Sequence, residues 1–219
     1  MAARKSTAKT SAKRKANAKK ANASVLDRII DASLDEAAVI GWRNATMDAI
    51  ASRANVRLGE ALLVVPTKAH MVLHLMDRVD TQTLSTVTRV EGDDTSRDRL
   101  FEIMMRRFDA LSRHREGFKS IIKATARDPA VAPLALCHLS SSLGAMLAAA
   151  GISADGLKGL IRIKGLGVVG AYALRAWMSG DSADLAKTMA ALDRALAQAE
   201  RIAKFSPFRR REKSDTTPV

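Results

Sequence analysis

Three short helical segments packed into residues 24–66 constrain the fold of this chain more than any other feature. Each begins near a residue that favours a helix start, or directly after a tight turn, and each ends at a residue that stops a helix. The expected helices are 24–40, 47–54 and 58–65, with caps at Ser24 and Thr46 and breaks at Gly41, Asn55-Val56 and Pro66. This spacing predicts a helix-turn-helix unit.

The rest of the chain is also predicted to be helical. Alanine is abundant and only five prolines occur, and no run alternates apolar and polar residues long enough for a sheet strand. Thr67 is expected to cap a fourth helix that reaches about Val90, and residues 91–95 form a linker. The helices expected after the linker are 96–112, 115–127, 129–150, 154–179 and 182–203, the last capped by Ser182.

The linker divides the chain into a domain over 24–90 and a larger one over 95–204. Helix 154–179 is apolar on nearly every side, so we expect it at the centre or at a subunit interface. The net charge of +13 lies mostly in the flanking segments, 1–23 and 205–219, which we predict to be disordered basic arms. Such arms attract phosphate backbones, although anionic membranes attract them too.

Nothing in the sequence carries catalysis, a cofactor or a metal. The letters from Gly165 to Gly170 match a dinucleotide fingerprint, but no strand precedes them, so close helix packing explains them better. His70 and His74 have metal-ligand spacing without a third ligand in register. The single cysteine, Cys137, lies in an apolar run and is expected to be buried, which fits a reducing cytoplasm.

A more specific pattern runs through the predicted helix-turn-helix unit: Gly41-Trp42, Thr46, Ile50-Ala51, Ala54, Val56, Gly59, Pro66 and Lys68. It resembles the TetR family of bacterial transcription regulators over about fifty residues. The resemblance implies an all-α fold. It also implies that the N-terminal helix-turn-helix domain is joined to a C-terminal helical domain that dimerises and holds a ligand cavity.

The same resemblance implies contact with double-stranded DNA, with the third helix in the major groove. Thr46 and Lys68 would contact phosphates, and Gly59 would allow close approach. The implied DNA-binding residues are Arg43, Thr46, Arg57, Gly59, Glu60, Leu63 and Lys68. The expected lining of the ligand cavity is Phe108, Ile122, Leu143, Met146, Leu166, Val169 and Tyr172.

The third helix departs from the family pattern. Leu62 stands where the family usually has Tyr, Val64 where it has His or Tyr, and Arg57 where it has Ser. Losing the Tyr and His removes donors that fix the register on phosphates. Helical spacing predicts that Leu58, Leu62 and Val65 are buried. Leu63 and Val64 then lie either in an ordinary core or in an exposed apolar patch.

The C-terminal half carries a second pattern in Met105-Arg106-Arg107-Phe108, Arg127-Asp128-Pro129, Ala176-Trp177-Met178, Asp181-Ser182-Ala183-Asp184 and Thr188-Met189-Ala190-Ala191-Leu192-Asp193. It is similar to the lipid-binding accessory proteins of ubiquinone biosynthesis, which share the TetR-type fold without reading DNA. Trp177 and Asp181-Ser182 also fit a plainer arrangement, an aromatic core residue followed by a helix cap.

The sequence therefore favours a cytoplasmic, homodimeric, non-enzymatic repressor that binds DNA and is controlled by a small apolar ligand. The alternative is an isoprenoid-binding accessory protein that docks on a membrane surface. The polarity of the third helix separates the two, because apolar side chains there oppose base readout, whereas the basic N-terminal arm favours DNA.

Overall fold

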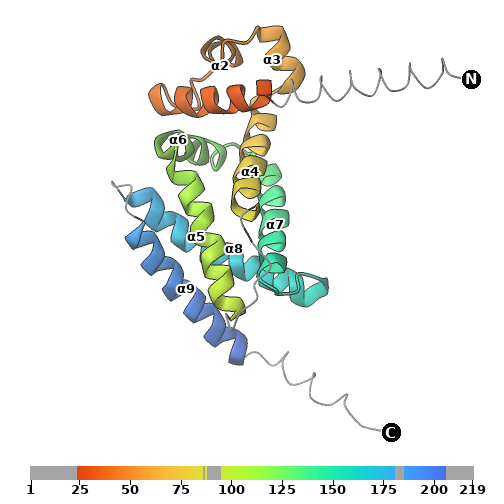
Figure 1. Ribbon diagram of the computed structural model, residues 1–219, viewed down its shortest axis with the longest axis vertical. Helices are drawn as coiled ribbons and strands as arrows, with labels where there is room; N and C mark the ends of the chain where they lie inside the picture. The colour runs from red at the N-terminus through yellow and green to blue at the C-terminus, as the bar shows by residue number, and fades with distance from the viewer. Residues whose placement is uncertain (1–23, 86, 88–94, 181–184, 206–219) are drawn as a thin grey trace, which may run out of the picture. The chain divides into compact units, whose positions relative to one another are not determined.

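The computed structural model describes residues 24–85, 87, 95–180 and 185–205. Throughout these ranges the regular elements are helices, and no strand occurs (Figure 1). The chain forms two compact units. The first unit comprises Met1–Arg78 and Arg113–Leu136, and the second comprises Val79–Ser112 and Cys137–Val219.

The first unit contains the helix over residues 24–39, α2 (Met47–Arg53), α3 (Leu58–Val64) and α6 (Arg115–Thr125). The second contains α5 (Ser96–Ser112), α8 (Gly156–Ser179) and α9 (Ala186–Phe205). Two helices begin in the first unit and end in the second: α4 (Lys68–Leu84) and α7 (Ala132–Ala149).

The predicted helices are confirmed, with small differences at their ends. Thr67 caps α4 as predicted, since its Oγ1 accepts a hydrogen bond from the His70 amide at 3.3 Å. The same helix stops at Leu84 rather than near Val90, and Ser85 lies in a turn. Residues 91–94 of the predicted linker and the predicted cap Ser182 lie outside the described ranges.

Residues 113–136 belong to the first unit, although the sequence placed them in the C-terminal domain. The reason is a close approach of backbones. A Cβ at Gly117 of α6 would overlap the carbonyl of Leu34, which is buried on helix 24–39. The Trp42 amide also donates to Ser120 Oγ at 2.8 Å. The boundary is therefore set by packing and not by the linker.

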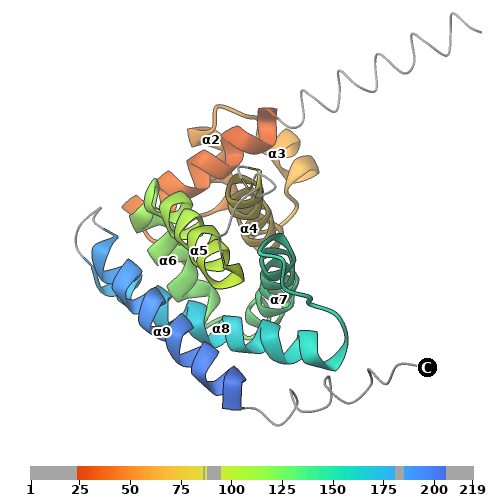
Figure 2. The same cartoon turned by 60° about the horizontal axis from the view of Figure 1, so that its bottom comes forward.

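In the second unit, α8 and α9 lie side by side, and α9 also packs on α5 (Figures 1 and 2). Trp177 is fully buried, and its Nε1 donates to Ser112 Oγ at 2.9 Å. Its role in this structure is that of an aromatic core residue. Glycine is not required for packing at Gly167 or Gly170, because a Cβ there would make ordinary contacts, with Leu143 Cδ1 at 3.6 Å and Met104 Cε at 3.4 Å.

The apolar helix α7 is less buried than its composition predicts. It is long and apolar enough to cross a membrane by length and composition alone, yet only 22% of it is buried. Cys137 is exposed, so the prediction of a buried thiol is wrong. The helix also carries His138 and a buried polar residue, Ser142. Residues 132–149 therefore form one largely exposed helix, which ends before Gly151, whose φ is +78°.

Candidate nucleic-acid interface

The loop before α2 presents one of the predicted phosphate ligands. Thr46 is exposed and forms the N-cap of α2, where its Oγ1 accepts a hydrogen bond from the Ala49 amide at 3.1 Å. A threonine hydroxyl both accepts and donates. The cap uses its acceptor capacity, so the hydroxyl proton remains free for an anionic acceptor. Arg43 is exposed on the same loop.

The turn between α2 and α3 is tight, and a side chain of helix 24–39 stabilises it. Asn55 has a φ of +51°, a left-handed conformation that Asn tolerates better than most residues. The Val56 amide donates to Ala51 O at 2.9 Å, and Arg28 Nε donates to Ala54 O at 3.1 Å. The turn is predictable from the sequence but the role of Arg28 is not, because nothing in the spacing of helix 24–39 indicates which basic residue reaches the turn.

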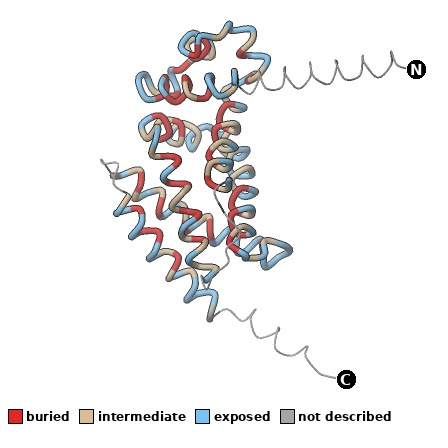
Figure 3. Tube along the Cα trace, in the orientation of Figure 1, coloured by how far each residue is buried: buried red, intermediate tan, exposed pale blue. Residues whose placement is uncertain are grey.

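Most residues of α3 are exposed to solvent (Figure 3). Only Ala61 and the following Val65 are fully buried, whereas Leu58 and Leu62 are each 38% exposed. The prediction that Leu58 and Leu62 are buried is therefore wrong. The helix has seven residues and packs through the small side chain of Ala61, so its larger neighbours remain at the surface. Leu63 is 87% exposed, which excludes an ordinary core position.

Glycine at position 59 is not required by the fold. A Cβ built there meets nothing within 4 Å, and Gly59 does not have a positive φ. Glycine inside a helix costs about 1 kcal/mol relative to alanine. With no internal reason for it, the glycine fits a surface that another molecule approaches closely.

Charged residues flank this glycine at the start of α3. Arg57 occupies the N-cap without a side-chain cap, and its side chain is 92% exposed. Glu60 is partly exposed, and its Oε2 lies 4.0 Å from Arg57 Nε. An exposed pair at this distance contributes little to stability. Both side chains are therefore available to a partner.

Lys68, in contrast, is held inside the first unit. Its Nζ donates to Trp42 O and, at 2.9 Å, to Ala45 O, and it lies 4.6 Å from the centroid of the Trp42 ring. Burial lowers the pKa of Lys68, and the nearby Asp128 carboxylate opposes this shift. Lys68, which is predicted to contact a phosphate, thus also holds the loop that carries Arg43 and Thr46 in place.

The residues predicted to line a ligand cavity do not all lie together. Five are buried in the second unit: Phe108, Leu143, Met146, Leu166 and Val169. Tyr172 differs, because it is 53% exposed and lines a surface groove with residues of α9. Ile122 belongs to the first unit. The buried five line neither the groove beside Tyr172 nor a second pocket, which is bordered by Trp42 and Lys68.

A buried polar network adjoins these apolar residues and was missed by sequence analysis. Arg107 on α5 is buried and pairs with Asp80 of α4. Ser142 of α7 accepts from Arg107 Nη1 at 2.8 Å and donates to Asp80 Oδ1 at 2.8 Å. Breaking such a pair costs several kcal/mol. Sequence spacing could not reveal it, because its members come from three separate helices.

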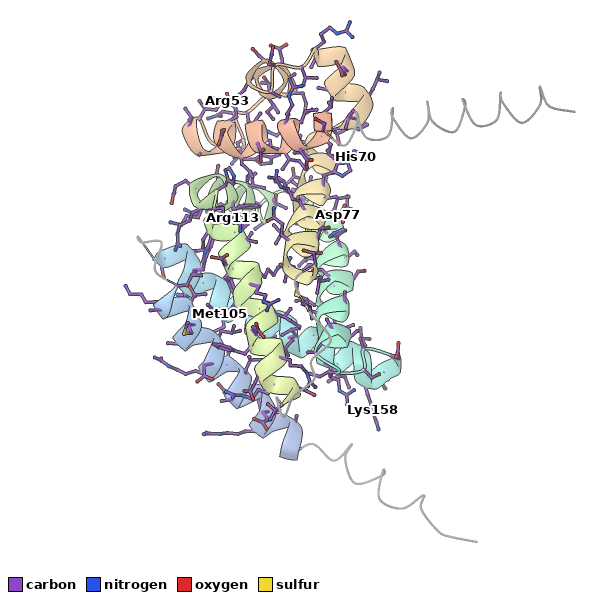
Figure 4. The ribbon with its side chains drawn as sticks, in the orientation of Figure 1. Arg53, His70, Asp77, Met105, Arg113 and Lys158 are labelled. Carbon is purple, nitrogen blue, oxygen red and sulfur yellow. The ribbon has the colours of Figure 1, made fainter. Side chains whose placement is uncertain are left out.

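Two further side chains of the first unit have structural partners. Arg53 reaches from α2 to helix 24–39, where its Nε donates to Glu36 Oε2 at 2.6 Å (Figure 4). The Nδ1 atom of His70 lies 2.8 Å from Thr67 Oγ1, beside the cap of α4. Across the described residues, no group of three His, Cys, Asp or Glu side chains could hold a metal ion.

The fold is shared with solved structures of TetR transcriptional regulators. One from Nitrosomonas europaea has a TM-score of 0.68 at 22% identity, covering 80% of this chain and 98% of the other. One from Rhodococcus sp. RHA1 has a TM-score of 0.63 at 18% identity, covering 84% and 98%. The multidrug binding protein EbrR complexed with imidazole has a TM-score of 0.51 at 19% identity, covering 77% and 88%. No family model and no curated protein matches the sequence.

Proposed function

We propose that the protein is a DNA-binding transcriptional regulator of the TetR type that reads double-stranded DNA with α3. The observation that carries this proposal is the outward face of α3, where Gly59 is left without an internal role and Arg57 and Leu63 are almost fully exposed. A short helix presented in this way after a tight turn is the reading element of helix-turn-helix proteins.

The side chains on this face define a chemistry of readout. Arg57 suits the acceptor pair of guanine, and Glu60 suits the amino group of cytosine. Leu63 suits the methyl group of thymine. Around them, Thr46 and Arg43 would hold phosphates, and the basic residues of segment 1–23 would add affinity without sequence preference. Apolar and charged contacts would thus share the readout.

The accessory-protein alternative is less favoured. Two of the similar solved structures given above are TetR transcriptional regulators, and Trp177, part of the pattern that suggested the alternative, is a fully buried core residue. Leu58, Leu62 and Leu63 do form an exposed apolar group, but Arg57 and Glu60 interrupt it at the N-terminal end of α3.

The proposal extends to a cytoplasmic homodimer with a small apolar effector. The buried cluster around Phe108 and Met146 would supply apolar contacts for the effector. Because Asp80 lies on α4 and pairs with Arg107 of α5, a ligand that displaced these side chains would act on the helix that begins beside α3. A second copy would cover the exposed stripe Leu157, Ile161, Val168 and Tyr172 of α8.

Replacing Gly59 by alanine tests the reading face without disturbing the fold. The free energy of unfolding of the variant is expected to equal that of the parent or to exceed it by up to about 1 kcal/mol, because alanine favours helix and its Cβ meets open space. Affinity for the chain's own upstream DNA should fall about tenfold, since the added methyl separates α3 from the base edges. Fluorescence anisotropy at fixed salt measures this.

Gly167→Ala on α8 is the control, because a Cβ there makes only an ordinary contact, with Leu143 Cδ1 at 3.6 Å, and lies off the exposed stripe of α8. It should gain similar stability and keep its DNA affinity. Unchanged specific binding by the Gly59 variant, or no preference for upstream over scrambled DNA in the parent chain, would refute the proposal.

A further inference from the structure

A pocket of about 460 Å³ lies wholly within the first unit, and no residue of α3 lines it. Three segments line it: the loop after helix 24–39, the start of α4, and the end of α6 with the connection to α7. Each segment contributes one cation, namely Arg43, Lys68 and Arg127. Asp128 is the one acidic residue of the lining, so the pocket carries an excess of positive charge.

The charges of this lining are not neutralised from within. Asp128 Oδ1 already accepts from the Ala130 amide at 2.9 Å and the Val131 amide at 3.2 Å. Within the described ranges, no ion pair involves Arg43 or Arg127. Two guanidinium groups therefore border the pocket with their donors available.

Lys68 adds a partly buried cation at the same place. Burial disfavours its charged form and lowers its pKa, while the Asp128 carboxylate opposes this shift. A negative group entering the pocket would favour the protonated amine. The pocket is thus better suited to an anion than to a neutral or cationic molecule.

A hydroxyl and an apolar wall complete the lining. Thr125 Oγ1 is buried and has no hydrogen-bond partner in the part of the chain that is described. A buried hydroxyl without a partner costs free energy that a ligand acceptor would recover. Trp42, Val72 and Val131 supply apolar surface beside it. The volume lies in the range of small-molecule sites.

We propose that this pocket binds a small organic anion, with one carboxylate or phosphate group held by Arg127, Arg43 and Lys68 and a compact apolar body against Trp42 and Val72. This site differs from the apolar cluster of the second unit, and it does not depend on whether α3 reads DNA.

The two tryptophans of the chain provide a direct test. Trp42 lines the pocket, whereas Trp177 is buried in the second unit. In a ¹H–¹⁵N spectrum of the full chain, a Trp177→Phe variant assigns the two indole signals. Benzoate and phenyl phosphate are titrated separately, to distinguish a carboxylate from a phosphate, beside the neutral benzamide. Binding on the order of 1 mM is expected for probes of this size.

The expected result is a saturable shift of the Trp42 signal with at least one anion, a much weaker response to benzamide, and an unmoved Trp177 signal. Arg127→Gln should weaken the anion about fivefold, whereas Arg175→Gln, an exposed arginine on α8, should leave it unchanged. Before titration, the Trp42 signal at its parent position reports that the first unit of each variant is folded, and the Trp177 signal reports the same for the second unit.

The proposal is overturned by any of three outcomes. These are no saturable shift with either anion at about ten times the expected dissociation constant, an equal response to benzamide, or unchanged anion affinity in Arg127→Gln. DNA is absent from the experiment, so a negative result would leave the proposal for α3 untouched.

Discussion

Lys68 shows how a single side chain can serve the fold at a position where a partner contact is also expected. Its amine satisfies the carbonyls of Trp42 and Ala45, which would otherwise lack this donor. Lys68→Ala should therefore lower the free energy of unfolding by about 1–3 kcal/mol. Urea denaturation measures the change.

Lys123→Ala provides the matched comparison, because Lys123 is exposed on α6 in the same unit. Its effect should stay within about 0.5 kcal/mol. Equal unfolding midpoints for the two variants would show that the two hydrogen bonds of Lys68 contribute nothing. If the difference is found, loss of DNA binding in Lys68→Ala cannot by itself identify a phosphate contact.

At the scale of elements, the close packing of α6 on helix 24–39 depends on one glycine, Gly117. Gly117→Ala would place a methyl group against the backbone of Leu34, which cannot rotate away as a side chain could. Such overpacking costs about 1–3 kcal/mol, against a gain of up to about 1 kcal/mol in helix propensity. We expect a net loss of stability, measured by thermal unfolding.

Gly167→Ala is again the comparison, because its Cβ would make only an ordinary contact with the Leu143 side chain. This variant should be as stable as the parent chain or more so. Stabilisation by both substitutions to the same extent would mean that α6 and helix 24–39 are not in close contact, and that residues 113–136 do not belong with the first unit.

At the scale of the whole molecule, the exposed stripe of α8 bears on assembly. Its apolar members recur on one side of the helix, and Val168 is 72% exposed. If two copies pair through this stripe, Val168→Glu buries an unpaired charge in each copy. The dimer dissociation constant should then rise at least about 100-fold. Sedimentation equilibrium measures it.

Leu63→Glu is the complementary variant, because Leu63 is also a largely exposed apolar residue, on α3. It should weaken DNA binding and leave the oligomeric state unchanged. A monomeric parent chain, or a Val168 variant that dimerises as the parent does, would contradict pairing through α8. Together the two variants separate the reading surface from the assembly surface.

The sequence by itself determined the helices and their order. Caps, glycines and prolines act within a few residues, so Thr46, Asn55 and Thr67 could be interpreted locally and their roles are confirmed. The TetR-type fold followed from the same local pattern in residues 41–68, and the solved structures share it.

Only the tertiary structure decided which faces are covered. Leu58 and Leu62 have the spacing of core residues, but α3 packs through Ala61, so the leucines stay at the surface. It also decided that Lys68 donates to backbone carbonyls of its own unit and that Arg43 and Arg127 line the same pocket. The buried network of Asp80, Arg107 and Ser142 likewise follows only from the tertiary structure. These contacts join residues far apart in the chain, and helical periodicity records which side of a helix is apolar but not what lies against it.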